Sequence, residues 1–269
     1  MMVWLIAGIV LRRLLRSKLL GITLVIAILI FALLSSSLLM LRNARSAGDT
    51  EVANQLSANV ILSALALMGF FACLVGLANG VTVIRREIRE GTIFSVLSKP
   101  LTRAEYLLGS YIGSLVYLSF VWIIFGLLYL GLVYLTRQPM GKLLGLILLA
   151  RWVYSVLMMS VAFFLALRFN AWIAVVLSVV VYNADSLYNI FPPLLRLVHV
   201  ELPDWVKGTV LFLFPSTNSL DVLFESLLKA RLNPAPVQWA FLSLIDYCAI
   251  MVLLAWVVFR RQELSPSTE

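Results

Sequence analysis

The sequence is poor in the side chains from which most metal and redox sites are built. It contains one histidine, His199, and two cysteines, Cys73 and Cys248. A single histidine excludes multi-histidine metal sites and the two-histidine helix of zinc proteases. Both cysteines fall inside long apolar runs, which argues against a disulfide framework. We interpret His199, in a connecting segment, as a surface residue.

Catalytic signatures are missing as well. No Gly-x-x-x-x-Gly-Lys-Ser/Thr phosphate loop occurs, so the chain cannot bind ATP by P-loop chemistry. No Gly-x-Ser-x-Gly nucleophile elbow occurs either. We therefore predict that the chain has no catalytic residue and no metal site of its own.

Charge is also scarce, since 13% of the 269 residues are charged whereas 62% are hydrophobic. The mean hydropathy is +1.01. A soluble domain cannot hide that much apolar surface, so we predict one all-α membrane domain covering residues 1–269. The net charge of +8 fits basic residues that flank membrane spans and face anionic lipid headgroups better than it fits nucleic-acid binding.

Six apolar runs are long enough to cross a hydrocarbon core of roughly 30 Å, which needs about 20 helical residues. They are residues 19–41, 58–84, 106–135, 143–167, 171–190 and 237–259. An even number of spans places both termini on one side. The segments on the same side as the termini hold more Lys and Arg than the segments on the opposite side. Because cytoplasmic segments carry an excess of these residues, we predict that both termini are cytoplasmic.

The N-terminal segment, residues 1–18, begins apolar and becomes basic only at Arg12. A secretory signal has the reverse order. We predict an interfacial helix along the inner leaflet. Its apolar face is expected to hold Trp4, Ala7, Leu11, Leu14 and Leu15.

The segment between the last two spans, residues 191–236, is predicted to be an outer loop with short outer-leaflet helices. Residues 206–214 are apolar but too short to cross, and Pro215 ends them. A lid or lateral exit and loose surface packing are both compatible with this pattern.

The densest charge lies in residues 85–105, between the second and third spans, and this segment must lie in water. Pro100 ends one helix, because proline disfavours helical geometry in the residue before it. Thr102 and Glu105 have the capping-box spacing that begins another helix. A protruding helix pair with an apolar face is typical of a docking surface for a second protein. An ordinary solvated loop with a membrane-surface helix is the alternative.

A sequence pattern within this segment is more specific than its charge. The residues that carry it are Glu87, Glu90-Gly91-Thr92, Leu97-Ser98-Lys99-Pro100, Arg103 and Leu108-Gly109. The pattern resembles the cytoplasmic loop between the second and third spans in permeases of the type-2 ABC exporter family. The chain departs from it at Ser110, where the family commonly has Lys, so no role is assigned to that position.

The resemblance implies partners and a place in the cell. A separate P-loop ATPase subunit in two copies would bind ATP and Mg²⁺. A second permease subunit, with a homodimer as the simplest case, would complete the membrane part. The complex would lie in the plasma membrane of a bacterium or archaeon, in contact with membrane lipids, and would export a substrate.

The same resemblance implies that the segment couples the ATPase to the spans. The acidic residues would position the loop, the glycine would permit a close turn, and the apolar side chains would fill a groove on the ATPase. Pro100 and Arg103 would fix the return into the third span. The residues assigned to coupling are Glu87, Glu90, Gly91, Thr92, Ile93, Phe94, Leu97, Pro100 and Arg103.

Three ionisable residues inside the predicted spans need a role, because a charge in lipid is costly. Arg151, Asp185 and Asp246 are expected at similar depths, so Arg151 would pair with one of the two aspartates. A structural tie is favoured over a role in the transport path.

Polar and small residues in the spans predict helix contacts. Asn79, Thr82 and Asn183 would line a polar path or bond across helices. Three glycine pairs with small-xxx-small spacing predict close helix approach: Gly76 with Gly80, Gly109 with Gly113, and Gly141 with Gly145.

A second class of function stays open, namely an ATP-independent, ion-coupled carrier or a membrane scaffold. Such a carrier would place Arg151, Asp185 and Asp246 in its path. In either case, an apolar interior with few charges favours a lipid-like or hydrophobic substrate, with glycans and peptides as alternatives.

Overall fold

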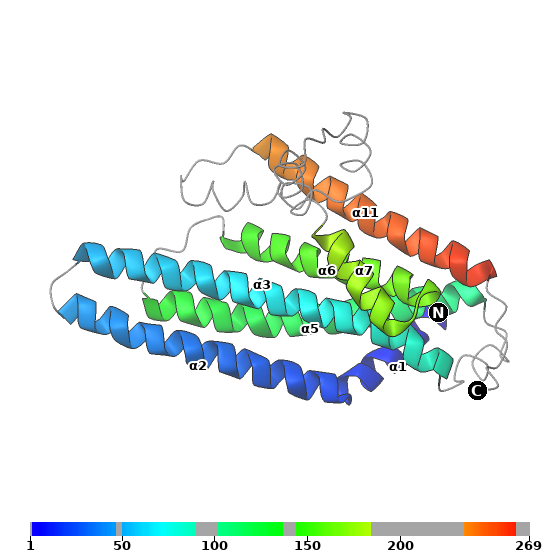
Figure 1. Cartoon of the computed structure of the whole chain (residues 1–269), viewed down its shortest axis with the longest axis horizontal. Helices are drawn as coiled ribbons and strands as arrows, with labels where there is room; N and C mark the ends of the chain where they lie inside the picture. The colour runs from blue at the N-terminus through cyan, green and yellow to red at the C-terminus, as the bar shows by residue number, and fades with distance from the viewer. Residues whose placement is uncertain (1, 47–49, 90–101, 137–143, 184–233, 262–269) are drawn as a thin grey trace, which may run out of the picture. The chain divides into compact units, whose positions relative to one another are not determined.

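The computed structural model describes residues 2–46, 50–89, 102–136, 144–183 and 234–261. Within these ranges every regular element is an α-helix, as predicted for an all-α domain. The helices, labelled in Figure 1, are α1 (Met2–Leu15), α2 (Lys18–Ser46), α3 (Thr50–Arg89), α5 (Arg103–Thr136), α6 (Leu144–Arg168), α7 (Ala171–Tyr182) and α11 (Pro234–Arg261).

Four of the described helices are long and apolar enough to cross a membrane. Their spans are Asn59–Arg85, Arg103–Leu135, Gly145–Arg168 and Phe241–Arg261. They match the second, third, fourth and sixth predicted spans.

The first and fifth predicted spans differ from these four. Met2–Leu15 and Leu20–Leu34 qualify only as a pair, bent by 57°. Helix α7 has 12 residues, and the rest of the fifth predicted span lies outside the described residues, as does the outer loop. The count of six spans therefore stays a prediction.

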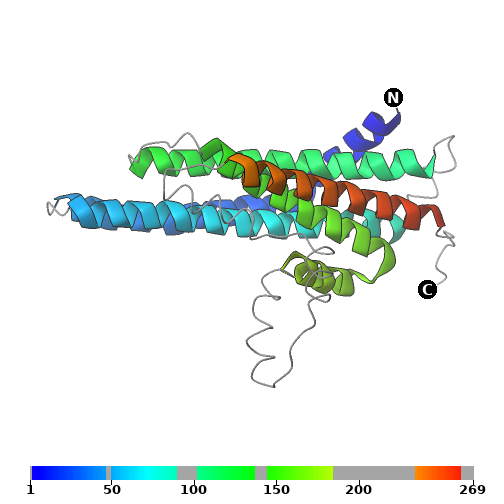
Figure 2. The ribbon, with the colours of Figure 1, turned by 90° about the horizontal axis from the view of Figure 1, so that it is seen from above.

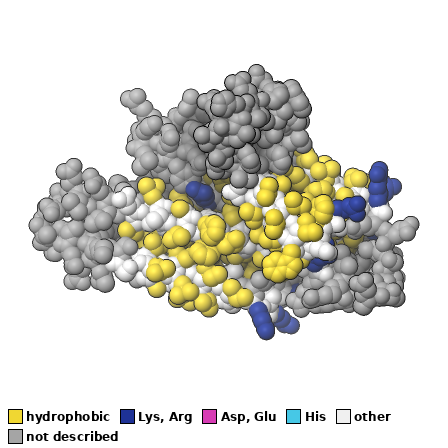
Figure 3. Space-filling view, viewed as in Figure 1, with side chains coloured by type: hydrophobic (Ala, Val, Ile, Leu, Met, Phe, Trp, Pro, Cys, Tyr) yellow, Lys and Arg dark blue, Asp and Glu magenta, His cyan; other side chains and the backbone are white. Residues whose placement is uncertain are grey.

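The chain divides into two compact units. The first comprises Met1–Val75 and Gly109–Ser155, and the second Gly76–Leu108 and Val156–Glu269. Helices α3, α5 and α6 each contribute residues to both units. The described surface is rich in exposed apolar side chains, as the space-filling view in Figure 3 shows, which is the surface that lipid requires.

In the first unit, α1 packs on α5 at two glycines. A Cβ atom at Gly109 would lie 2.7 Å from the Cβ of Ile6, and one at Gly113 would lie 2.9 Å from the Cβ of Val10. Both distances are too short for real carbon contacts, so only glycine allows this approach. The predicted close contact at this pair is confirmed, and α1 is its partner.

The contact with α5 decides which face of α1 is buried. Its buried residues are Ile6, Ala7, Val10 and Leu14. Of the residues on the predicted apolar face, Ala7 and Leu14 are buried against the protein, whereas Trp4 is 71% exposed and Leu15 is 37% exposed. Nearly every position of α1 before Arg12 is apolar, so hydrophobic periodicity does not indicate which face is buried. The position of the glycines of α5 determines it.

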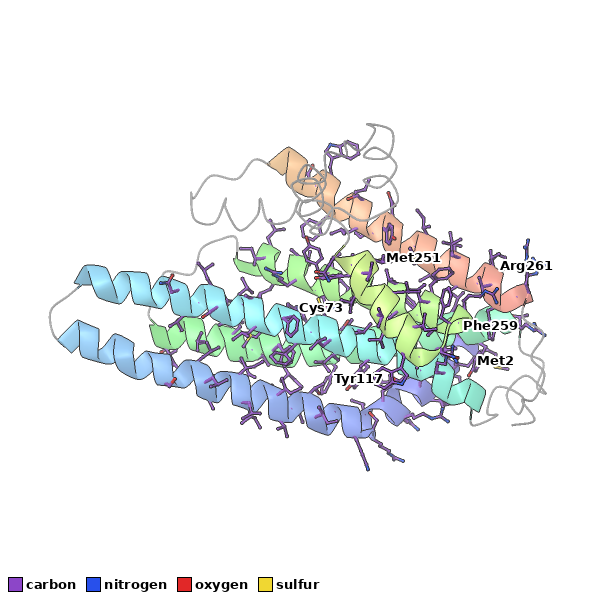
Figure 4. The ribbon with its side chains drawn as sticks, in the orientation of Figure 1. Met2, Cys73, Tyr117, Met251, Phe259 and Arg261 are labelled. Atoms are coloured by element: carbon purple, nitrogen blue, oxygen red, sulfur yellow. The ribbon has the colours of Figure 1, made fainter. Side chains whose placement is uncertain are left out.

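Elsewhere in the first unit, α5 and α6 are joined by a hydrogen bond in which Trp152 Nε1 donates to Ser119 Oγ at 3.2 Å. Tyr117 of α5, labelled in Figure 4, is fully buried.

Gly145 has no heavy atom within 4 Å of a built Cβ. The predicted close approach is therefore wrong at that position.

In the second unit, α3 packs on α6 at Gly80. A Cβ there would lie 2.5 Å from the Met159 carbonyl oxygen and 2.9 Å from the Cβ of Ala162. The two helices are therefore in direct backbone contact, as the spacing predicts. After α6, a short turn at Asn170 leads into α7, which Figure 2 shows from above.

Candidate functional site

The candidate site consists of the two helix ends with which the charged segment, residues 85–105, begins and ends. Both belong to the second unit. Residues 90–101 lie outside the described residues, and with them Glu90, Gly91, Thr92, Ile93, Phe94, Leu97 and Pro100. The described ends are the last turns of α3, which carry Glu87, and the first turn of α5. Helix α3 continues without a break from the apolar span into the charged residues up to Arg89.

The start of α5 is fixed by a complete capping box. The backbone N–H of Thr102 donates to the Glu105 carboxylate at 3.0 Å, and the backbone N–H of Glu105 donates to Thr102 Oγ1 at 3.3 Å. The Thr102 hydroxyl also donates to the carboxylate at 2.9 Å. This confirms the predicted helix start, because the reciprocal bonds satisfy N–H groups that have no partner within the helix.

The end of α3 is tied to the end of α6. Arg85 Nε donates a hydrogen bond of 3.0 Å to the carbonyl oxygen of Ala166. Ala166 lies in the last turn of α6, whose carbonyls lack partners within the helix and carry the negative end of its dipole. A guanidinium is therefore a favourable partner at this place.

The start of α5 is tied to the end of α11 in the same way. Arg103 Nη1 donates to the carbonyl oxygen of Arg260 at 3.4 Å, which is long for a hydrogen bond. Beside it, the rings of Tyr106 and Phe259 stack with centroids 6.3 Å apart and planes inclined by 21°. Phe259, labelled in Figure 4, is 1% exposed. The start of α5 therefore meets the end of α11 through a buried ring pair and a hydrogen bond from Arg103.

At each end of the charged segment, an arginine side chain therefore donates a hydrogen bond to a carbonyl oxygen near the carboxyl end of another helix. A displacement of this segment would act on α3 and α5 and, through these bonds, on α6 and α11. The family resemblance implied that Arg103 fixes the return into the third span, whereas the roles of Arg85 and of both acceptors were not predicted. The acceptors are backbone carbonyls, which have no sequence signature.

The polar residues expected in the spans, Asn79, Thr82 and Asn183, differ in burial and in hydrogen-bond partner. Asn79 is buried, and its Nδ2 donates to the sulfur of Met159 at 3.8 Å, across α3 and α6. Thr82 is exposed and donates to the carbonyl of Ala78 at 2.7 Å on its own helix.

Asn183 likewise bonds within its own helix, donating from Nδ2 to the carbonyl of Val179 at 2.8 Å. Among the three residues, only Asn79 has a bond that crosses helices in the described part of the chain.

The pairing predicted for the ionisable residues of the spans is not tested by the described residues. Arg151 belongs to the first unit, where its Cδ lies 3.1 Å from a Cβ built on Gly69. A glycine at that position leaves room for the arginine side chain. Asp246 is an exposed residue of α11 in the second unit, and Asp185 lies outside the described residues. Their pairing stays a prediction.

The whole chain was compared with known proteins. A family model described as ABC-2 family transporter protein matches residues 4–264. A search of curated proteins finds no match. The match covers nearly the full length and agrees with the helical architecture and with the pattern in the charged segment, so the chain belongs to the ABC-2 transporter family.

Proposed function

We propose that this chain is the membrane-spanning permease subunit of an ATP-driven exporter, in which a separate ATPase binds ATP and Mg²⁺. The observation that carries the proposal is the pair of ties at the ends of the charged segment, from Arg85 to Ala166 and from Arg103 to Arg260. They connect the segment that would meet the ATPase with four helices. Family membership supports the same role.

In this mechanism the chain supplies no bond-making chemistry. Closure of two ATPase subunits would push residues 90–101, with Ile93, Phe94 and Leu97 seated in a groove of the ATPase. The push would enter the membrane through α3 and α5 and would change access to the substrate path. Energy thus enters at one protein interface.

A second permease subunit fits the burial of the spans. In the span Phe241–Arg261, 11% of the most apolar 18-residue stretch is buried within the chain. The corresponding share in the span Gly145–Arg168 is 72%. Much of α11 is therefore available to lipid or to another subunit. We propose a homodimer with two ATPase copies, its termini on the cytoplasmic side of the plasma membrane.

Changing Glu90 and Phe94 to alanine together tests the interface. We expect the co-purifying ATPase to bind about 30-fold more weakly, because one buried aromatic anchor is worth roughly 2 kcal/mol. The measurement is a pull-down in mild detergent, with vanadate-sensitive ATPase activity assayed in the eluate.

The matched control changes Glu51 and Phe70 of α3 to alanine and should leave ATPase recovery unchanged. Full recovery with the first variant would exclude the proposed interface. An oligomer of the wild-type chain that never carries an ATPase would favour the ATP-independent carrier or scaffold.

Charge exchange tests the proposed pairing of Arg151. We expect Arg151→Asp and the change at its true partner, either Asp185→Arg or Asp246→Arg, each to reduce the yield of folded protein, because an unpaired charge within a span is costly. Combining Arg151→Asp with the change at its true partner should restore the yield, measured by size-exclusion chromatography. If neither combination rescues the single variants, the pairing is wrong.

A further inference from the structure

We infer that α1 carries a binding site for the headgroup of an anionic phospholipid, at the bend between α1 and α2. The inference concerns the first unit alone and does not depend on the proposed ATPase. It rests on how apolar and basic side chains are distributed over the exposed face of α1.

The face of α1 that does not meet α5 is divided along its length. Leu5, Ile9, Arg12 and Arg16 follow one another at helical spacings of four, three and four residues, so they form one stripe. Leu5 is 60% exposed and Ile9 is 55% exposed, and both arginines are exposed. The stripe is thus apolar at its amino end and cationic at its carboxyl end.

The bend places a further cation beside this end of the stripe. The last turn of α1 closes with the Ser17 hydroxyl donating to the Leu14 carbonyl at 2.6 Å, and α2 begins at Lys18, which is exposed. The axes of Met2–Leu15 and Leu20–Leu34 differ by 57°. Arg12, Arg16 and Lys18 therefore gather where one helix ends and the next begins.

The first unit has almost no acidic residue to neutralise these cations. Its sequence holds only Asp49 and Glu51. Both follow α2 in the sequence, and a helix of its 29 residues is about 43 Å long at 1.5 Å per residue. That distance exceeds the screening length of roughly 10 Å at moderate ionic strength. The counter-charge for the bend must come from outside the unit.

An anionic phospholipid matches both parts of the stripe. Its phosphate would accept hydrogen bonds from the two guanidinium groups, which bind phosphate oxygens in pairs. Its acyl chains would cover Leu5, Ile9 and the 71%-exposed Trp4. The opposite face of α1 packs on Gly109 and Gly113, so the lipid would bind without displacing α1 from α5.

The test uses the full chain purified in a neutral detergent. Short-chain phosphatidylglycerol is titrated in, and the rise in the thermal unfolding temperature gives an apparent affinity. We expect the double variant Arg12→Gln, Arg16→Gln to bind about 25-fold more weakly, at about a fivefold loss for each basic residue removed. Phosphatidylcholine of the same chain length should give little or no rise with either protein.

A matched control removes the same charge elsewhere. Arg168 and Arg261 are exposed arginines at the ends of α6 and α11, and changing both to glutamine should leave the phosphatidylglycerol affinity unchanged. An equal loss in this control, or an equal rise with phosphatidylcholine, would overturn the inference. An equal rise with inorganic phosphate would assign the site to a free anion and would also overturn it.

A measurement on the wild-type protein covers the case in which the double variant does not fold. The phosphatidylglycerol effect should decline when the ionic strength is raised from about 0.05 M to about 0.5 M, because the contact is between exposed charges. The charge-preserving variant Arg12→Lys, Arg16→Lys should retain most of it. Salt-independent binding would contradict an electrostatic site.

Discussion

Replacing Gly80 with alanine should force α3 away from α6 and lower the free energy of unfolding by about 2 kcal/mol, within the usual range for overpacking. The new Cβ would meet the Met159 carbonyl oxygen at 2.5 Å and the backbone nitrogen of Phe163 at 3.0 Å. Backbone atoms of a membrane helix cannot swing aside as a long side chain can. The measurement is unfolding in mixed micelles with increasing denaturing detergent.

Gly126→Ala is the matched control for this prediction. Gly126 is also a helical glycine, but no heavy atom lies within 4 Å of a Cβ built there. Alanine also favours helix more than glycine, so this variant should be as stable as wild type or slightly more so. Equal stability of Gly80→Ala and Gly126→Ala would show that the α3 and α6 contact is not tight.

Replacing Arg85 with glutamine should loosen α3 from α6 while leaving the ATPase bound. The change removes a hydrogen bond from a charged donor, worth roughly 1.5 to 3 kcal/mol, but does not alter residues 90–101. Spin labels on cysteines placed at Thr82 and Asn170, with Cys73 and Cys248 changed to serine, report the distance between α3 and the turn that follows α6. We expect this distance distribution to broaden, most clearly in the vanadate-trapped complex.

Three comparisons make the Arg85 result interpretable. Arg85→Lys keeps a charged donor and should recover most of the wild-type distribution. Arg168→Gln removes an exposed arginine from the last turn of α6 and should change nothing. Arg103→Gln should have a smaller effect on this distance than Arg85→Gln, because its bond joins α5 to α11 and not α3 to α6. If Arg85→Gln gave the wild-type distance distribution, the hydrogen bond from Arg85 would not couple the movement of α3 to α6.

The elements that sequence could predict are those with a local signal. The membrane helices follow from long apolar runs, and the start of α5 follows from Thr102 and Glu105 at capping-box spacing. Both signals lie within a few turns of one helix. No distant part of the chain is needed to interpret them.

The contacts that sequence could not predict depend on the partner element. Gly113 and Gly145 lie in equivalent spacing patterns, yet only Gly113 has a helix packed against it. The buried face of α1 follows from that contact and not from its own periodicity. The acceptor for Arg85 is a backbone carbonyl of Ala166, which any residue would provide.

The unbroken course of α3 gives it the properties of a lever. Its 40 residues make a rod of about 60 Å, roughly twice the thickness of a hydrocarbon core. Gly80 lies about 14 Å from the charged end, at 1.5 Å per residue. In the proposed mechanism, a push on the charged end would therefore turn the part of α3 that belongs to the second unit about its contact with α6 at Gly80.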